Sequence, residues 1–158
     1  MPSEPSPEKL EQRAKNILLH QLSRSMKTRH QLAQVLEKRE IPSEISLRVL
    51  DRFQEAQLID DAAFARAFVN SRMSAGGKSK RIMARELSQK GVAPDLIEQA
   101  LEPVSSEIEL ELVRDLVKKR AARLQGLDPQ TRQRRMLGFL ARRGFSTSLA
   151  LSVMREIE

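Results

Sequence analysis

Two clusters of lysine and arginine are the residues of this sequence whose types and spacing could support chemistry. The first cluster has five cations and one carboxylate between residues 78 and 90, and the second has five cations and no carboxylate between residues 132 and 143. They comprise Lys78, Lys80, Arg81, Arg85 and Lys90, and then Arg132, Arg134, Arg135, Arg142 and Arg143. Such side chains bind phosphates and carboxylates through charge-assisted hydrogen bonds. We therefore predict that these ten residues form a binding surface for an acidic partner.

The composition of the whole chain favours the same kind of partner. Its 158 residues contain 28 Lys and Arg against 21 Asp and Glu, which gives a net charge of +7. A basic balance of this size is typical of proteins that bind nucleic acid or an acidic protein surface. The chain has no Trp or Tyr, and its five Phe residues fall mostly at core-periodic positions, so base stacking is not expected. Contacts to nucleic acid would therefore be made to phosphates and would weaken as salt is added.

No constellation of residues predicts catalysis, a cofactor or a metal site, and we expect a protein that is not an enzyme. His20 and His30 have no Cys or Ser partner pattern nearby and are expected on the surface. The absence of Cys excludes disulfides, thiolate metal ligands and thiol catalysis. The adjacent carboxylates Asp60 and Asp61 could suggest acid–base chemistry, but they precede an apolar helical pattern, where a carboxylate caps the backbone.

The elements that position these residues are predicted by apolar periodicity and by helix caps. Residues 60–101 divide into three short helices, broken at Gly76 and Gly77 and again near Gly91. The second of them begins after a cap at Ser79, and its apolar residues Met83 and Leu87 face away from a stripe formed by Lys78, Arg81 and Arg85. No segment alternates apolar and polar residues as a strand does. The predicted fold class is all-α.

The same unit occurs three times along the chain. Moving back 51 places takes Leu87, Val92, Leu96 and Leu101 to Leu36, Ile41, Ile45 and Leu50, and moving forward 53 places takes them to Leu140, Phe145, Leu149 and Met154. We therefore predict a tail at residues 1–6 and three-helix repeats at 7–56, 57–103 and 104–158. Repeats that bury their cores against neighbours predict an elongated monomer. The lack of a long apolar run or signal peptide predicts a cytoplasmic protein without membrane contact.

Three stretches resemble the RecX family of bacterial RecA regulators. Residues 58–65, LIDDAAFA, are similar to the LIDD..FA signature of that family; residues 85–92, RELSQKGV, to its EL..KG segment; and residues 139–145, FLARRGF, to its FL.RRGF segment. The resemblance extends from about Ala14 to Ile157. Glu40 and Gln57 depart from it, because they stand where the family pattern usually has Gly. Each must then adopt a left-handed conformation at a strain of about 1 kcal/mol, or its helix must end differently.

The resemblance implies a function that composition and periodicity do not. It implies a protein that lodges in the groove of the RecA–DNA filament and modulates, mainly by inhibition, strand exchange, ATP hydrolysis and co-protease activity. It would thereby act in recombination, DNA repair and the SOS response. The partners implied are the RecA filament and the phosphates of single- or double-stranded DNA.

Two other interpretations of the residues stay open. The three-helix units could dock on DNA directly, as helix-turn-helix modules do, although no recognition helix recurs in all copies. Alternatively, the chain is a passive helical scaffold and its cations are a solvated face. Binding to naked DNA would favour the first interpretation, and binding to neither DNA nor the RecA filament would favour the second.

Overall fold

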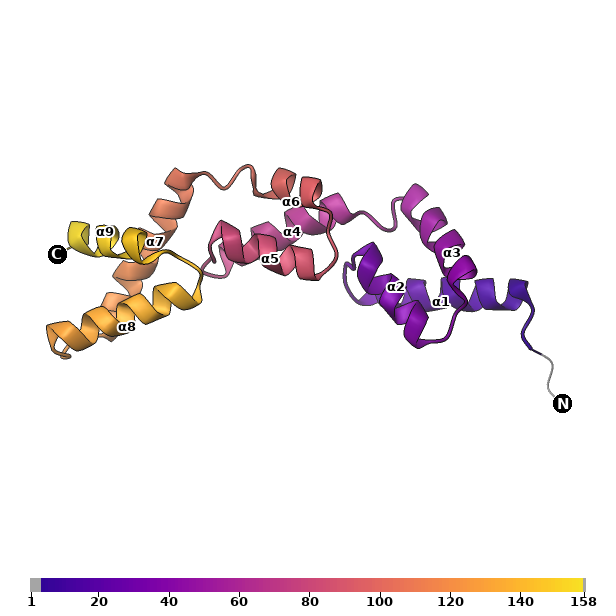
Figure 1. The fold of residues 1–158 in the computed structure, drawn as a ribbon, viewed down its shortest axis with the longest axis horizontal. Helices are drawn as coiled ribbons and strands as arrows, with labels where there is room; N and C mark the ends of the chain where they lie inside the picture. Colours follow the sequence, from indigo (N-terminus) through magenta and orange to yellow (C-terminus); the bar gives the residue numbers. More distant parts are fainter. Residues whose placement is uncertain (1–3, 158) are drawn as a thin grey trace. The chain divides into compact units, whose positions relative to one another are not determined.

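The computed structural model describes residues 4–157 and contains nine α-helices and no strand over that range, which confirms the all-α prediction (Figure 1). The helices are α1 (Pro7–Arg24), α2 (Arg29–Lys38), α3 (Ser43–Glu55), α4 (Asp61–Ser74), α5 (Lys80–Gln89), α6 (Pro94–Leu101), α7 (Ser106–Arg123), α8 (Pro129–Arg142) and α9 (Thr147–Ile157). The three helices predicted within residues 60–101 are observed as α4, α5 and α6.

Helices begin where side chains satisfy the first backbone N–H groups. Thr28 forms a capping box at α2: its Oγ1 accepts from the Gln31 N–H at 3.1 Å, and its own N–H donates to Gln31 Oε1 at 3.0 Å. The Ala63 N–H donates to Asp60 Oδ1 at 3.0 Å, and the Ile82 N–H donates to Ser79 Oγ at 3.2 Å. Such caps stabilise a helix by about 1 kcal/mol each. The predicted capping roles of Asp60 and Ser79 are confirmed.

The described chain divides into two compact units. One unit runs to Arg66 and includes Leu87–Ile97, and the other contains Ala67–Glu86 and the chain from Glu98 onward. The helices α1, α2 and α3 contact one another in the first unit, as α7, α8 and α9 do in the second (Figure 1). Each of α4, α5 and α6 contributes one part to each unit. The elongated array that the repeats predict stays a prediction.

Each unit has an apolar core built from the residues that recur in the repeat. In the first unit Leu36, Ile41, Ile45 and Leu50 are buried. In the second unit Leu140 and Phe145 are buried, and the equivalent Leu149 and Met154 are half-buried against the same cluster. Burial of one such side chain contributes roughly 1.5–3 kcal/mol. The core positions predicted from the repeat are thus confirmed in both units.

A recurring junction joins the end of one middle helix to the start of another. At the first junction the Thr28 hydroxyl donates to the Lys90 carbonyl at 2.6 Å, which brings the end of α5 to the start of α2. At the second junction the Ser79 N–H donates to the Arg143 carbonyl at 2.9 Å, which brings the end of α8 to the start of α5. Thr28 and Ser79 are both buried. The residues 28 and 79, and likewise 90 and 143, are equivalent positions of the repeat.

Each junction requires a glycine after the helix that ends there. Gly91 has φ +87°, and a Cβ built on it would lie 2.2 Å from the Cβ of His30. Gly144 has φ +89°, and its Cβ would lie 2.1 Å from Ile82 Cγ1 and 2.3 Å from Ser79 Oγ. Real Cβ atoms do not approach other atoms so closely. Glycine therefore serves two needs here, the left-handed backbone and the close approach of two helices.

Two helix ends lack this glycine and adopt the left-handed conformation nonetheless. Glu40 follows α2 with φ 61°, and Gln57 follows α3 with φ 59°. A side chain in this region costs about 1 kcal/mol or more because its Cβ crowds a carbonyl oxygen. Of the two outcomes that the sequence left open at these positions, the strained one is observed.

Candidate anion-binding surface

The helix α5 begins at Lys80, so Lys78 lies before the helix. The prediction that Lys78, Arg81 and Arg85 form a stripe on one helix is therefore wrong for Lys78. Lys78 instead donates from Nζ to Glu86 Oε1 at 3.0 Å. Arg72 of α4 donates to the same carboxylate, with 3.1 Å between Nη2 and Oε2. Ser79 occupies the cap position and turns the chain there, so that Lys78 reaches back to Glu86 rather than extending the exposed stripe.

The charge of Glu86 is balanced by these two cations. Partial burial disfavours its ionised form, but the hydrogen bonds and charges of Lys78 and Arg72 outweigh that effect and hold the pKa of Glu86 below its ordinary value. The carboxylate is the only acidic residue of the first basic cluster. Because it is paired with Lys78 and Arg72, it leaves Arg81 and Arg85 unneutralised.

Arg81 and Arg85 are exposed on the outer face of α5, while Met83 and Leu87 on the opposite face are fully buried. This alternation is the one predicted from the spacing of the apolar residues. Neither arginine forms a hydrogen bond or an ion pair with any residue that the structure describes. Both guanidinium groups are thus available to an external anion.

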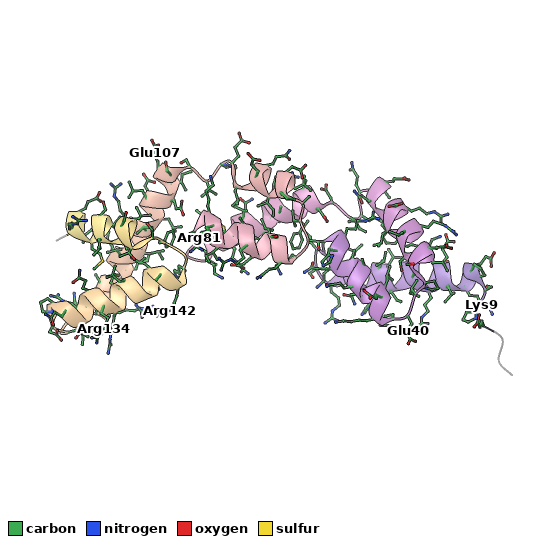
Figure 2. The ribbon with its side chains drawn as sticks, viewed as in Figure 1. Lys9, Glu40, Arg81, Glu107, Arg134 and Arg142 are labelled. Atoms are coloured by element: carbon green, nitrogen blue, oxygen red, sulfur yellow. The ribbon has the colours of Figure 1, made fainter. Side chains whose placement is uncertain are left out.

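The helix α8 carries the second group of open cations. Met136 and Leu140 are buried, and the four remaining cations of the cluster within α8 are exposed, namely Arg132, Arg134, Arg135 and Arg142. Among residues 4–157 none of these four forms an ion pair or a hydrogen bond. Figure 2 shows Arg134 toward the start of α8, and Arg142 toward its end, where α8 meets the start of α5 that carries Arg81. The open cations of the two helices therefore belong to one compact unit.

The remaining three predicted residues, Lys80, Lys90 and Arg143, are half-buried. Arg143 donates from Nη1 to the Gly77 carbonyl at 2.9 Å, and its guanidinium carbon lies 4.9 Å from the centroid of the Phe139 ring. Lys80 is half-buried and lines a groove with Glu98 and Glu102. Lys90 is half-buried, and its carbonyl accepts from Thr28. We therefore restrict the candidate surface to six residues, Arg81, Arg85, Arg132, Arg134, Arg135 and Arg142, called the open arginines below.

Several polar residues have structural roles that the sequence did not reveal. Asp61 Oδ1 accepts from the Arg29 N–H at 3.0 Å and thus supports the start of α2, not its own helix alone. Glu109 Oε1 accepts from the Lys80 N–H at 3.2 Å at the start of α5. The guanidinium carbon of Arg120 lies 4.8 Å from the centroid of the Phe139 ring. No local sequence signal marks such contacts, because their partners are 19 to 32 residues away.

The described residues hold no group of three or more His, Cys, Asp or Glu that could bind a metal ion. His20 and His30 are both exposed, as expected. Within residues 4–157 no helix has both the length and the apolar character needed to span a membrane.

The fold and this surface define a class: all-α proteins of tandem three-helix repeats whose middle helices present arginine. Comparison with protein families gives the particular assignment. Three family models match in order: the first three-helix domain of RecX at residues 14–53, the second at 60–101 and the third at 107–154. Together they cover most of the chain, and the chain belongs to the RecX family.

Relatives and solved structures agree with this assignment. The chain is 46% identical over 153 residues to the regulatory protein RecX of Streptomyces coelicolor, covering 97% of this chain and 81% of that protein. It is 44% identical over 151 residues to the regulatory protein RecX of Thermobifida fusca, covering 96% and 82%. A crystal structure of RecX from Lactobacillus salivarius superposes with a TM-score of 0.80 at 22% identity over 93% of this chain and 96% of that one. These relatives support a regulatory role for the chain.

Proposed function

We propose that this chain binds the filament that RecA forms on DNA and that it modulates, mainly by inhibition, the recombinase, ATPase and co-protease activities of that filament. Family membership supports RecA as the partner, since the matched models and relatives are RecX proteins. The observation that carries the proposal is the set of open arginines, which lie on the exposed faces of α5 and α8 and form no ion pair with any described residue, although Arg134 interacts electrostatically with Asp128.

The chemistry of the open arginines suits a filament that exposes both carboxylates and phosphates. A guanidinium group presents a planar set of donors that can bind either anion in a bidentate manner. These arginines need not break an existing ion pair in order to bind, since none of them forms an ion pair within residues 4–157. Binding is expected to release counterions and so to weaken steeply as salt is added.

The test is a variant in which Arg81, Arg85, Arg134 and Arg135 are all replaced by alanine. Alanine favours helix, so α5 and α8 are expected to persist, as circular dichroism would verify. Binding to RecA filaments on single-stranded DNA is expected to fall by at least tenfold at low salt, and its salt dependence is expected to flatten. Inhibition of ATP hydrolysis by RecA should fall in parallel.

The matched control replaces four exposed cations by alanine, of which two lie on α1, one ends α2 and one follows α2, namely Arg13, Arg24, Lys38 and Arg39. This control removes the same net charge from a different part of the chain. It therefore shows whether the effect on binding depends on the position of the cations or only on the total charge. Unchanged filament inhibition by the first variant, or an equal loss in both, would contradict the proposed surface.

Binding to naked DNA distinguishes the alternative function. If the wild-type chain binds DNA as tightly without RecA as with it, the open arginines serve direct DNA binding. We expect a clear preference for the filament.

A further inference from the structure

Another group of cations surrounds a groove between α7, α8 and the loop before α5. The groove has a volume of about 600 Å³ and is lined by Lys119, Arg120, Arg123 and Arg143, with Phe139 and Gly76 between them. No carboxylate lines it. Four cations therefore face one cavity whose volume falls within the range typical of ligand sites. None of these four residues is among the open arginines.

Two of the four cations are held in place by the same aromatic ring. The guanidinium carbons of Arg120 and Arg143 lie 4.8 and 4.9 Å from the centroid of Phe139. Arg143 is further fixed by its hydrogen bond to the Gly77 carbonyl at 2.9 Å. A guanidinium that is already ordered loses little side-chain entropy when it binds an anion. The cluster is thus organised before any ligand arrives.

The donors of the groove are not all satisfied by the fold. Arg120 Nε is buried and has no hydrogen-bond partner among the described residues. Buried donors without a partner are rare, and each calls for a reason. Arg123 is exposed and has no ion pair or hydrogen bond among residues 4–157. Lys119 is partly neutralised at the surface, because its Nζ lies 2.9 Å from Asp115 Oδ2. The groove therefore has an excess of positive charge, and Arg120 and Arg123 have hydrogen-bond donors without a partner among the described residues.

We propose that this groove binds a phosphate oxyanion, with Arg120 and Arg123 as its principal donors. Phosphate fits the observed chemistry because its oxygens accept several hydrogen bonds at once and its charge offsets that of the clustered guanidiniums. Two sources share this chemistry, the phosphates of a free nucleotide and those of a nucleic-acid backbone. The groove is independent of the proposed filament surface, since the two share no residue.

The experiment titrates the full-length chain at low salt with pyrophosphate and with ATP, by calorimetry. Saturable binding at one site is expected for the wild type. The double variant Arg120→Gln, Arg123→Gln is expected to weaken this binding at least tenfold, as the loss of charge-assisted hydrogen bonds predicts. The control Arg13→Gln, Arg24→Gln makes the same change in net charge at exposed residues of α1, outside both the groove and the open arginines, and should leave pyrophosphate binding within about twofold of the wild type.

Arg120 also contacts Phe139, so its replacement could perturb the fold. The single variant Arg123→Gln avoids this, because Arg123 is exposed, and a severalfold loss of affinity is expected from it alone. Absence of saturable pyrophosphate binding in the wild type would overturn the proposal. An equal loss in the control variant would also overturn it, since the binding would then reflect diffuse surface charge.

Competition identifies the source of the phosphate. A twelve-nucleotide oligothymidylate is added to the pyrophosphate-saturated chain. If it displaces pyrophosphate, and if the Arg120, Arg123 variant weakens its binding too, a backbone phosphate occupies the groove. If pyrophosphate stays bound, the site takes a free nucleotide. Because filament inhibition depends on other residues, loss of pyrophosphate binding with filament binding retained would show that the two sites are separate.

Discussion

The ten cations predicted from the sequence differ in whether the fold already uses their charge. Lys78 neutralises Glu86, and Arg143 holds the loop at Gly77 against Phe139. Arg81 and Arg135 are exposed and make no such contact with described residues. Substitution in the first group should therefore change stability, whereas substitution among the open arginines should change binding.

Glu86 provides a test of the first group through pH. Its pKa is lowered in the folded chain, so the stability that it contributes is present above the pKa of the unfolded chain and is lost as pH falls through the folded value. Glu86→Gln is expected to lower the free energy of unfolding by roughly 1 kcal/mol at pH 7. The difference between wild type and variant should shrink as the solution is acidified.

Urea unfolding at a series of pH values from 7 to about 3 measures this difference. Asp95→Asn is a suitable control, because Asp95 is an exposed acidic residue of α6 without an ion pair among the described residues. A stability difference for Glu86→Gln that stays constant over the whole range would show that the carboxylate charge is not what stabilises the fold.

The sequence predicted that Arg81 and Arg85 face outward, but it did not predict which cations are paired. Helical spacing alone separates Arg81 and Arg85 from Met83 and Leu87, because that separation depends on one helix. The pairing of Lys78 with Glu86 depends on the point where α5 begins, and Arg72 joins them from the preceding helix. A loop conformation and a contact between helices decide such pairs, and neither has a periodic signature.

Among the elements, the helices were the most predictable part and the junctions between them the least. Caps such as Thr28 and Asp128 are local, so their hydrogen bonds span three residues. The junction of Ser79 with Arg143 spans 64 residues and could not be read from either end. Its traces in the sequence are a glycine recurring 53 places apart, at Gly91 and Gly144, and a hydroxyl residue recurring 51 places apart, at Thr28 and Ser79.

Gly144→Ala tests the junction. An alanine there must adopt a positive φ, and its Cβ would collide with Ile82 and Ser79. The first effect costs about 1 kcal/mol and the second roughly 1–3 kcal/mol more, since a crowded contact must relax by moving a helix. Thermal or urea unfolding should therefore show a loss well above 1 kcal/mol.

Gly126→Ala is the matched control. Gly126 has a similar φ of +86°, but a Cβ on it would meet nothing within 4 Å. Only the backbone strain of about 1 kcal/mol is expected there. Equal losses for the two variants would mean that the close approach at the junction contributes nothing to stability.

For the whole molecule, the net charge of +7 understates how unevenly charge is distributed. The open arginines and the four cations of the groove all belong to the second unit. The composition indicated an acidic partner, and the spacing of the basic clusters indicated α5 and α8. The groove has no such signature in the sequence, because its cations come from α7 and from the end of α8, which are separate in the chain.

The junction also bears on whether separate copies of the chain can join. A repeat whose ends match can in principle add further copies head to tail, and such contacts produce open fibres because they do not close. Of the three middle helices, α5 and α8 each end at a junction, whereas the end of α2 has no junction partner among the described residues. Glu40 follows α2 at the position where Gly91 follows α5 and Gly144 follows α8. The matching helix start, that of α8, carries Asp128 where they have Thr28 and Ser79.

In a head-to-tail contact between two copies, the start of α8 in one copy would therefore meet the side chain of Glu40 in the other copy instead of a glycine. The carboxylates of Asp128 and Glu40 would also face each other. We expect the wild-type chain to sediment as a monomer over a wide range of concentration. Association, if any, is expected only in the double variant Glu40→Gly, Asp128→Ser, and wild-type oligomers that grow with concentration would contradict this. The strained residue after α2 would then disfavour head-to-tail association between copies of the chain.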